Sequence, residues 1–175
     1  MPELQDPTKL NGAQRPRTAA RVAAVQALFQ IEQNGDQTDT VIEQFLVHRF
    51  GTTLDGASYE DGCIPEADTV LFRSIVRDAI ASKTVLTDSI RQVLPATWPL
   101  ERLDPVLRAL FLAAGGEGKD DSIPTPILIN EYMDVAHSFF SGDEPRLVNG
   151  VLDALFRKMK SADNDGELPS DQPID

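Results

Sequence analysis

The chain has 175 residues, 41% of them hydrophobic and 25% charged, which fits one soluble globular domain with a sizeable core. No apolar run is long enough to span a membrane, the first residues lack the order of a signal peptide, and a single cysteine, Cys63, excludes an internal disulfide. The net charge of -12 argues against nucleic-acid binding over the whole surface. We therefore expect a cytoplasmic protein without a membrane partner, in which any site for a polyanion is local.

The N-terminal part is predicted to be a flexible arm followed by a helix. Residues 1–14 show no apolar period and are interpreted as the arm. The helix should begin near 16–18, because Pro suits a first turn and Thr can cap it, and should end near Asn34-Gly35. The stretch from Lys9 to Arg21 holds basic residues and no acidic one, which makes it a basic edge on an acidic protein.

A second helix and a loop are expected next. Thr40-x-x-Glu43 has the pattern of a capping box and precedes an apolar stripe that ends near Phe50. Residues 51–65 are rich in glycine and long for a connection inside a domain, so they are predicted to form a mobile loop.

The middle of the chain is predicted to be helical, with breaks at prolines and glycines. Apolar residues of helical period follow Pro65 and continue to Pro95, and the pattern leaves open whether they form one helix or two with a break near 82–84. Pro99 is expected to open a further helix, whose last turn Gly115-Gly116 should weaken.

The C-terminal part has the pattern of a helical hairpin. Apolar stripes of helical period over 127–140 and 146–159 are separated by a turn that contains a glycine and a proline. Asn130 and Glu131 are expected to cap the first of these helices. Asn149-Gly150 is expected to allow close helix packing in the second.

The predicted architecture is all-α, with about seven helices and no sheet, because no segment alternates with a period of two. The helical domain is expected to cover residues 15–160, between the arm of residues 1–14 and a tail of residues 161–175. That tail lacks an apolar stripe, is acidic and contains two prolines, so it is predicted to be disordered.

No pattern in the chain indicates catalysis, a metal site or a cofactor. The only histidines, His48 and His137, have no second ligand at metal-binding spacing. Gly115-Gly116-Glu117-Gly118 follows a helix and not a strand, so it does not match a phosphate-binding loop. We therefore expect a protein that is not an enzyme.

The basic edge is the one constellation with a chemical meaning. Arg15, Arg17 and Arg21 can each meet a phosphate, and arginine also stacks on bases. Thr18 and the free amides of a first helical turn add donors. Three arginines give only modest affinity for RNA, so stacking residues or a partner protein should contribute. The alternative is that the arginines only solvate a helix start.

Three blocks of the chain resemble the signatures of the NusB-type transcription antitermination factors. Their order and spacing over residues 15–158 make the resemblance specific. It implies an all-helical fold of two packed bundle halves and an RNA-binding transcription factor. The blocks are an arginine-rich arm leading into Ala23-Ala-Val-Gln-Ala-Leu-Phe29, the stretch Leu100-Glu-Arg-Leu-Asp-Pro-Val106 to Glu117, and Ile129-Asn-Glu with Ala136-x-x-Phe139 and Val148-Asn-Gly-Val-Leu-Asp153.

The resemblance also implies partners. Members of this family bind the boxA element of ribosomal RNA operons as single-stranded RNA, together with the small-subunit ribosomal protein that acts as NusE. The pair joins other Nus factors on RNA polymerase and suppresses premature termination. By position, the residues expected to bind RNA are Arg15, Arg17, Thr18, Arg21, Phe139, Arg146 and Leu147, and those expected on the partner side are Phe29, Leu107 and Glu117.

The chain departs from the family pattern at two of these positions. Leu147 stands where an aromatic residue is usual, and Leu107 where an acidic one is common. Two other functions stay open: a helical accessory domain for an rRNA cytosine methyltransferase system, since such domains are also found fused to those enzymes, and a structural helical adaptor without RNA binding.

Overall fold

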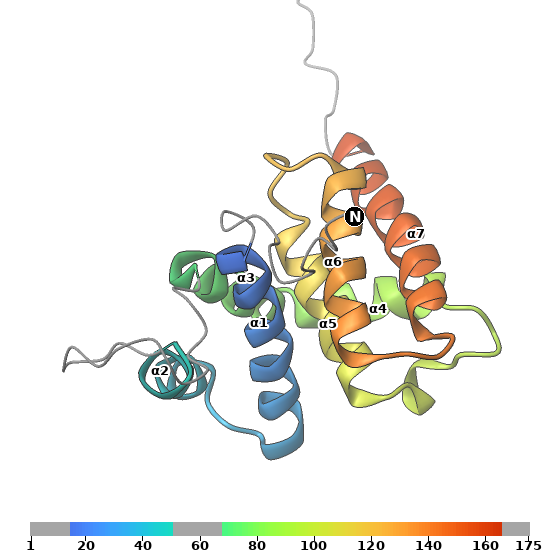
Figure 1. The fold of residues 1–175 in the computed structure, drawn as a ribbon. Coiled ribbons are helices and arrows are strands. Elements are labelled where there is room, and N and C mark those ends of the chain that lie inside the picture. Colours follow the sequence, from blue (N-terminus) through green and yellow to red (C-terminus); the bar gives the residue numbers. More distant parts are fainter. Residues whose placement is uncertain (1–14, 51–67, 166–175) are drawn as a thin grey trace, which may run out of the picture.

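The computed structural model describes residues 15–50 and 68–165 and is all-helical in these ranges (Figure 1). No strand occurs in either range, and no helix in them is both long and apolar enough to cross a membrane. The prediction of about seven helices and no sheet is confirmed. The helices are α1 (Arg15–Asn34), α2 (Thr38–His48), α3 (Thr69–Ala81), α4 (Lys83–Val93), α5 (Pro105–Glu117), α6 (Thr125–Phe139) and α7 (Glu144–Asp165), with a 3-10 turn, η1 (Leu100–Arg102), before α5.

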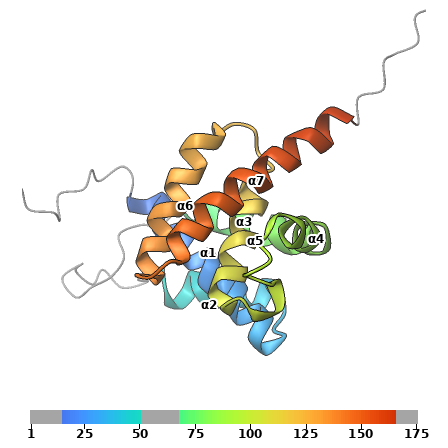
Figure 2. The same cartoon turned by 90° about the vertical axis from the view of Figure 1, so that its right-hand side faces the viewer.

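Helix α5 forms the centre of the fold. Every residue from Ala109 to Glu117 is buried, because α1 and α3 pack on α5 from one side and α4, α6 and α7 surround the other (Figure 1). The fold therefore has two packed halves that share α5, as the resemblance implied. Figure 2 shows the C-terminal helix α7 crossing the second half and running beyond it.

The helix ends follow local chemistry. Gly35 has a positive φ of 69° and its amide donates to the carbonyl of Ile31, so it stops α1 as predicted. Asp68 caps α3 by accepting from the amide of Leu71 at 2.9 Å. The helical stretch that follows it divides at Ser82, which separates α3 from α4, so the second of the two open alternatives is correct.

Two predicted helix starts are wrong. Helix α2 begins at Thr38, ahead of the proposed capping box, and its N-cap residue Gln37 makes no side-chain cap. The helix expected from Pro99 is instead a 3-10 turn, and α5 begins at Pro105 after Asp104, whose carboxylate accepts from the amide of Val106.

The glycines near the end of α5 allow close packing. A Cβ on Gly116 would lie 2.8 Å from the backbone nitrogen of Ala79 in α3, which is closer than real Cβ contacts. The helix continues through both Gly115 and Gly116 to Glu117. The expectation of a weakened last turn therefore missed their packing role.

The hairpin of α6 and α7 is present, with corrections to its details. Asn130 and Glu131 lie inside α6 rather than at its start, which is preceded by Pro124. Gly150 lies on an exposed face of α7, and a Cβ at this position would have no atom within 4 Å, so this glycine does not serve close helix packing. Helix α7 continues to Asp165, past the expected tail start at residue 161; residues 1–14, 51–67 and 166–175 lie outside the described part.

Candidate nucleic-acid interface

The start of α1 presents one exposed cation. The side chain of Arg17 is 54% exposed, and its Nε lies 4.0 Å from the Asp68 carboxylate, at the limit of an ion pair. The amide of Asp68 also donates to the carbonyl of Pro16, so the starts of α1 and α3 lie together. The first turn of α1 contains no acidic residue. An anion at this end of the helix would therefore meet a guanidinium and the positive end of the helix dipole.

The other residues predicted to bind RNA at this end of the chain, Arg15 and Thr18, lie in the first turn of α1. Arg15 is the first residue of α1, and its side chain lies outside the described part of the structure. Thr18 is half-buried in the first turn and makes contacts of its own.

Arg21 is buried and not available to a phosphate. Its side chain is 2% exposed, and it donates to Glu117 at 2.7 Å and to Glu131 at 2.9 Å. Tyr132 donates its hydroxyl to the same Glu117 carboxylate at 2.7 Å. The expectation that Arg21 contacts RNA directly is corrected. Arg17 and Arg21 share a face of α1, but α5 and α6 pack over that face at Arg21 and cover its side chain, whereas Arg17, one turn earlier, stays exposed.

The pKa values of Arg21 and Tyr132 are both shifted in this cluster. Burial alone would lower the pKa of Arg21, but the hydrogen bonds and charge of Glu117 outweigh it and raise that pKa. Burial, reinforced by the nearby charge of Glu117, raises the pKa of Tyr132 well above its ordinary value. The cluster joins α1 to α5 and α6.

A second candidate region lies at the turn between α6 and α7. Phe139 and Phe140 are half-buried, with ring centroids 6.3 Å apart. Arg146 is exposed in the first turn of α7 and makes no ion pair with any residue that the structure describes. Leu147 is only 8% exposed, so most of its surface belongs to the core. This turn offers aromatic surface next to a cation.

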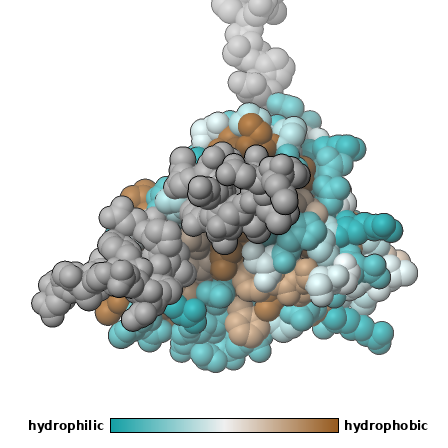
Figure 3. Space-filling view, in the orientation of Figure 1, coloured by the Kyte–Doolittle hydropathy of each residue, from teal (hydrophilic) through white to brown (hydrophobic). Residues whose placement is uncertain are grey.

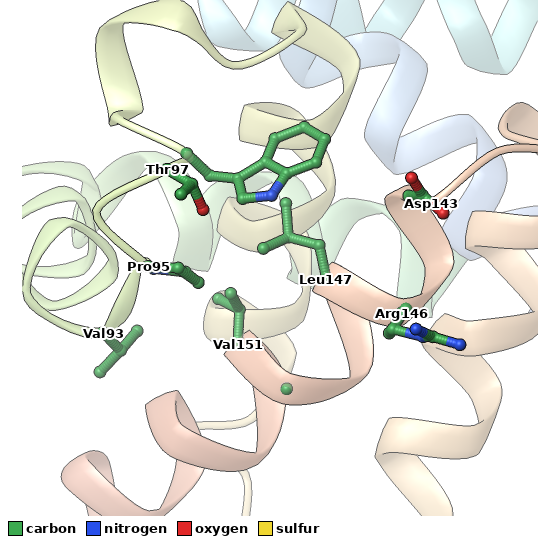
Figure 4. Close-up of a pocket in the computed structure, with 9 residues that line it drawn as sticks. Val93, Pro95, Thr97, Asp143, Arg146, Leu147 and Val151 are labelled. Atoms are coloured by element: carbon green, nitrogen blue, oxygen red, sulfur yellow. The ribbon is translucent and has the colours of Figure 1, made fainter.

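Beside this turn, α7 and the segment after α4 form the walls of a pocket of about 540 Å³ that is open to solvent (Figure 4). Leu147 and Val151 point from α7 towards the segment that carries Pro95, and Arg146 extends from α7 to the opposite side. The remaining lining residues are Val93, Thr97, Trp98, Asp143 and Gly150.

The two candidate regions face the same side of the molecule. In Figure 2 the start of α1 and the turn between α6 and α7 both lie at the left edge, which is the front of Figure 1. Figure 3 shows hydrophobic side chains at the lower centre of that front face, around the end of α6, while the surface over α7 is mostly hydrophilic. A single extended ligand could therefore contact both regions.

The residues predicted on the partner side are less exposed than expected. Leu107 is fully buried, and Glu117 is 6% exposed and bound to Arg21, so neither can contact a partner directly. Phe29 is half-buried on α1. Glu32, one turn further along α1, pairs with Arg108 at 2.9 Å, and both line an open groove of about 370 Å³ between α1, α4 and α5.

Sequence reasoning missed several residues of these surfaces. Trp98 was not predicted, although the single tryptophan of the chain, in a connection between two prolines, could have been recognised as a candidate for a binding surface. Glu32 and Arg108 carry no motif, and only their contact across the groove reveals them. Within residues 15–50 and 68–165, no group of three or more potential ligands could hold a metal ion.

A sequence model of the NusB family matches residues 18–157. The chain belongs to the NusB family. The transcription antitermination protein NusB of Gluconobacter oxydans is 52% identical to it over 165 residues, covering 94% of this chain and 99% of that protein. The corresponding protein of Granulibacter bethesdensis is 50% identical over 159 residues, covering 90% and 98%.

Solved structures agree with this assignment. The structure of T. maritima NusB has a TM-score of 0.63 and 25% identity, covering 82% of this chain and 92% of that one. Family membership confirms the prediction of a transcription antitermination factor that is not an enzyme.

Proposed function

We propose that this NusB-family protein binds boxA-type single-stranded RNA of ribosomal RNA operons in the cytoplasm. The observation that carries the proposal is the start of α1, whose first turn has the exposed Arg17 and no acidic residue. This helix start lies on the same side of the molecule as the turn between α6 and α7 (Figure 2). Arginines contact phosphates and aromatic rings stack on unpaired bases, which are the two contacts that a single strand offers.

The division of roles follows from exposure. We assign Arg17 and Arg146 to phosphates of the RNA, because both are exposed cations. Arg15 and Thr18 lie next to the proposed course of the RNA at the start of α1. Phe139 is assigned a base, and Leu147 forms an apolar wall of the adjoining pocket. So few cations bind RNA only modestly, since each phosphate contributes a limited, salt-dependent increment.

A partner protein is therefore part of the proposal. We assign the small-subunit ribosomal protein in the NusE role to the groove between α1, α4 and α5, next to Phe29, where Glu32 and Arg108 offer charges of both signs. The pair would share the RNA, join the other Nus factors on RNA polymerase and suppress premature termination.

The test is a titration of fluorescently labelled boxA RNA with the full chain, alone and with the ribosomal protein, followed by anisotropy. A scrambled RNA of equal length and composition is the control. The expected result is weak binding alone and tighter binding with the partner, for boxA above the scrambled strand. Equal affinity for both strands in the presence of the partner would contradict boxA recognition.

The variant Glu32→Arg addresses the partner surface separately. It places like charges against Arg108 and reverses the charge of the groove, so binding of the ribosomal protein should weaken. RNA binding by the chain alone should persist, because Glu32 lies towards the far end of α1 from Arg17. Unchanged partner affinity would move the partner to another face.

A further inference from the structure

The geometry points to Trp98 as a base-stacking residue, with the pocket between Trp98 and α7 as the seat of one RNA base. This inference rests on the proposed RNA-binding function and adds a residue and a subsite to it. The pocket is built by two segments about 50 residues apart: the turn after α4, which carries Pro95, Thr97 and Trp98, and the first turns of α7.

The walls of the pocket suit a flat aromatic ligand. Trp98 is half-buried and packs against the core, so its indole is held in place without being covered. The amide of Trp98 donates to the carbonyl of Pro95 at 2.9 Å, which fixes the turn that carries the ring. Leu147 and Pro95 supply the remaining apolar surface. Ring and aliphatic surfaces together favour a base over a sugar or a phosphate.

The rim carries a cation, Arg146, a carboxylate, Asp143, and a free donor on Trp98. Arg146 extends from α7 on the side away from Leu147 (Figure 4), is exposed and forms no ion pair with a described residue, so it can meet a phosphate of the strand whose base is stacked. The indole Nε1 of Trp98 makes no hydrogen bond to a described residue and reaches solvent. A nucleotide combines an aromatic base, an anionic phosphate and acceptor atoms, and it matches these three features together.

Gly150 gives the pocket its open side. Glycine inside a helix costs stability, yet here nothing occupies the space that a side chain would fill. The bare helix surface lets a ligand approach the backbone of α7 next to Leu147. An apolar peptide side chain would also fit the walls, but a nucleic-acid strand brings both a ring for these walls and a phosphate for Arg146, so the observations favour RNA.

The experiment uses the fact that Trp98 is the only tryptophan of the chain. The full-length protein is titrated with single-stranded boxA RNA while tryptophan fluorescence is recorded, and RNA anisotropy is measured in parallel. We expect quenching of the fluorescence with the same midpoint as the anisotropy change. RNAs that lack one base at successive positions should identify a single position whose loss abolishes the quenching.

Two variants and a control accompany the titration. Trp98→Ala should weaken RNA binding roughly 5- to 150-fold, the range for loss of one stacked base, without changing the salt dependence. Gly150→Leu should block the pocket from an exposed helix position and weaken binding as well, even if Trp98→Ala is poorly folded. Val85→Ala, at an exposed position near the start of α4, should bind like the wild type.

The outcomes separate this inference from the proposed function. If the anisotropy shows RNA binding but the fluorescence is unchanged and Gly150→Leu binds like the wild type, the base site is wrong while the RNA-binding function stands. If the fluorescence responds to the ribosomal protein and not to RNA, the pocket is a protein contact and the inference is overturned. If no RNA binds with or without the partner, the proposed function itself fails.

Discussion

Arg21 and Glu117 are 96 residues apart in the chain and form a buried bidentate ion pair, with Nη2 2.7 Å and Nε 3.0 Å from the two carboxylate oxygens. Glu131 and Tyr132 of α6 complete the cluster. The pair connects the first turns of α1, where the proposed RNA contacts begin, to the central helix α5. Arg21 is therefore a positioning residue for the start of α1 rather than an RNA contact.

Removal of the Arg21 guanidinium should lower the free energy of unfolding. Arg21→Met leaves Glu117 and Glu131 without their cation, and loss of one partner of a buried pair costs about 3–5 kcal/mol. Urea unfolding followed by circular dichroism measures the change. Arg157→Met, which removes an exposed pair with Asp153, should cost less than about 1 kcal/mol. Equal losses in the two variants would contradict the role assigned to Arg21.

Tyr132 should make the protein sensitive to alkaline pH. Its pKa is raised in the folded protein by burial and by Glu117, whereas an unfolded tyrosine releases its proton near pH ~10. Above that pH the unfolded chain releases the proton while the folded protein still holds it. The stability that Tyr132 contributes is therefore fully present below the unfolded pKa and is lost as the pH rises from there towards the folded pKa.

The measurement is the free energy of unfolding at about pH 9 and about pH 11, on either side of the ordinary tyrosine pKa. The loss between these values should be smaller in Tyr132→Phe than in the wild type. Tyr132→Phe should itself be less stable at neutral pH, because the Glu117 carboxylate loses a hydrogen bond. The same alkaline loss in both proteins would show that Tyr132 ionises freely.

Two helical glycines should respond in opposite directions to alanine. Gly116→Ala drives a Cβ against the backbone of Ala79 and should destabilise by about 1–3 kcal/mol. Gly150→Ala meets open space and should stabilise by about 0.5–1 kcal/mol through helix propensity. Thermal unfolding of the two single variants decides, and stabilisation by Gly116→Ala would mean that α3 and α5 are farther apart than described.

Asp143 should oppose RNA binding at the pocket. Its exposed carboxylate lines the same pocket as Arg146 and repels an approaching phosphate. Asp143→Asn should therefore tighten RNA binding about two- to five-fold, on the order of the ~1 kcal/mol between unit charges ~4 Å apart in water. Anisotropy titration measures it, with Asp163→Asn near the far end of α7 as the matched control. Weaker binding of Asp143→Asn would indicate that this carboxylate contacts the RNA favourably.

The helices themselves could be predicted because their apolar residues recur with helical period, as in the hairpin of α6 and α7. The burial of individual side chains between helices could not be predicted in this way. Arg17 and Arg21 look alike in sequence, and only the distant Glu117 decides that one is solvent-exposed and the other internal. Gly116 and Gly150 likewise differ only in what lies opposite them.

The candidate surface could be predicted only in part, because the burial of its side chains depends on residues that are distant in the chain. The family resemblance identified both regions, and the structure places their backbones on one side of the molecule (Figure 2). The resemblance could not indicate that Leu107 is enclosed by the core, because the exposure of a residue in a helix depends on which other helices pack against it. Trp98 enters the surface because the turn after α4 brings it against α7.

The salt dependence of boxA RNA affinity tests the central claim most directly, because it counts the phosphates that the protein neutralises. The measurement is the slope of log K against log salt concentration for the wild type, Arg17→Ala, Arg146→Ala and the control Arg157→Ala. We predict that Arg17→Ala and Arg146→Ala each reduce the slope by about 0.7, the value per phosphate of a single strand, and that Arg157→Ala leaves it unchanged. Slopes and affinities that are the same in all four proteins would contradict an RNA path from the start of α1 to the start of α7.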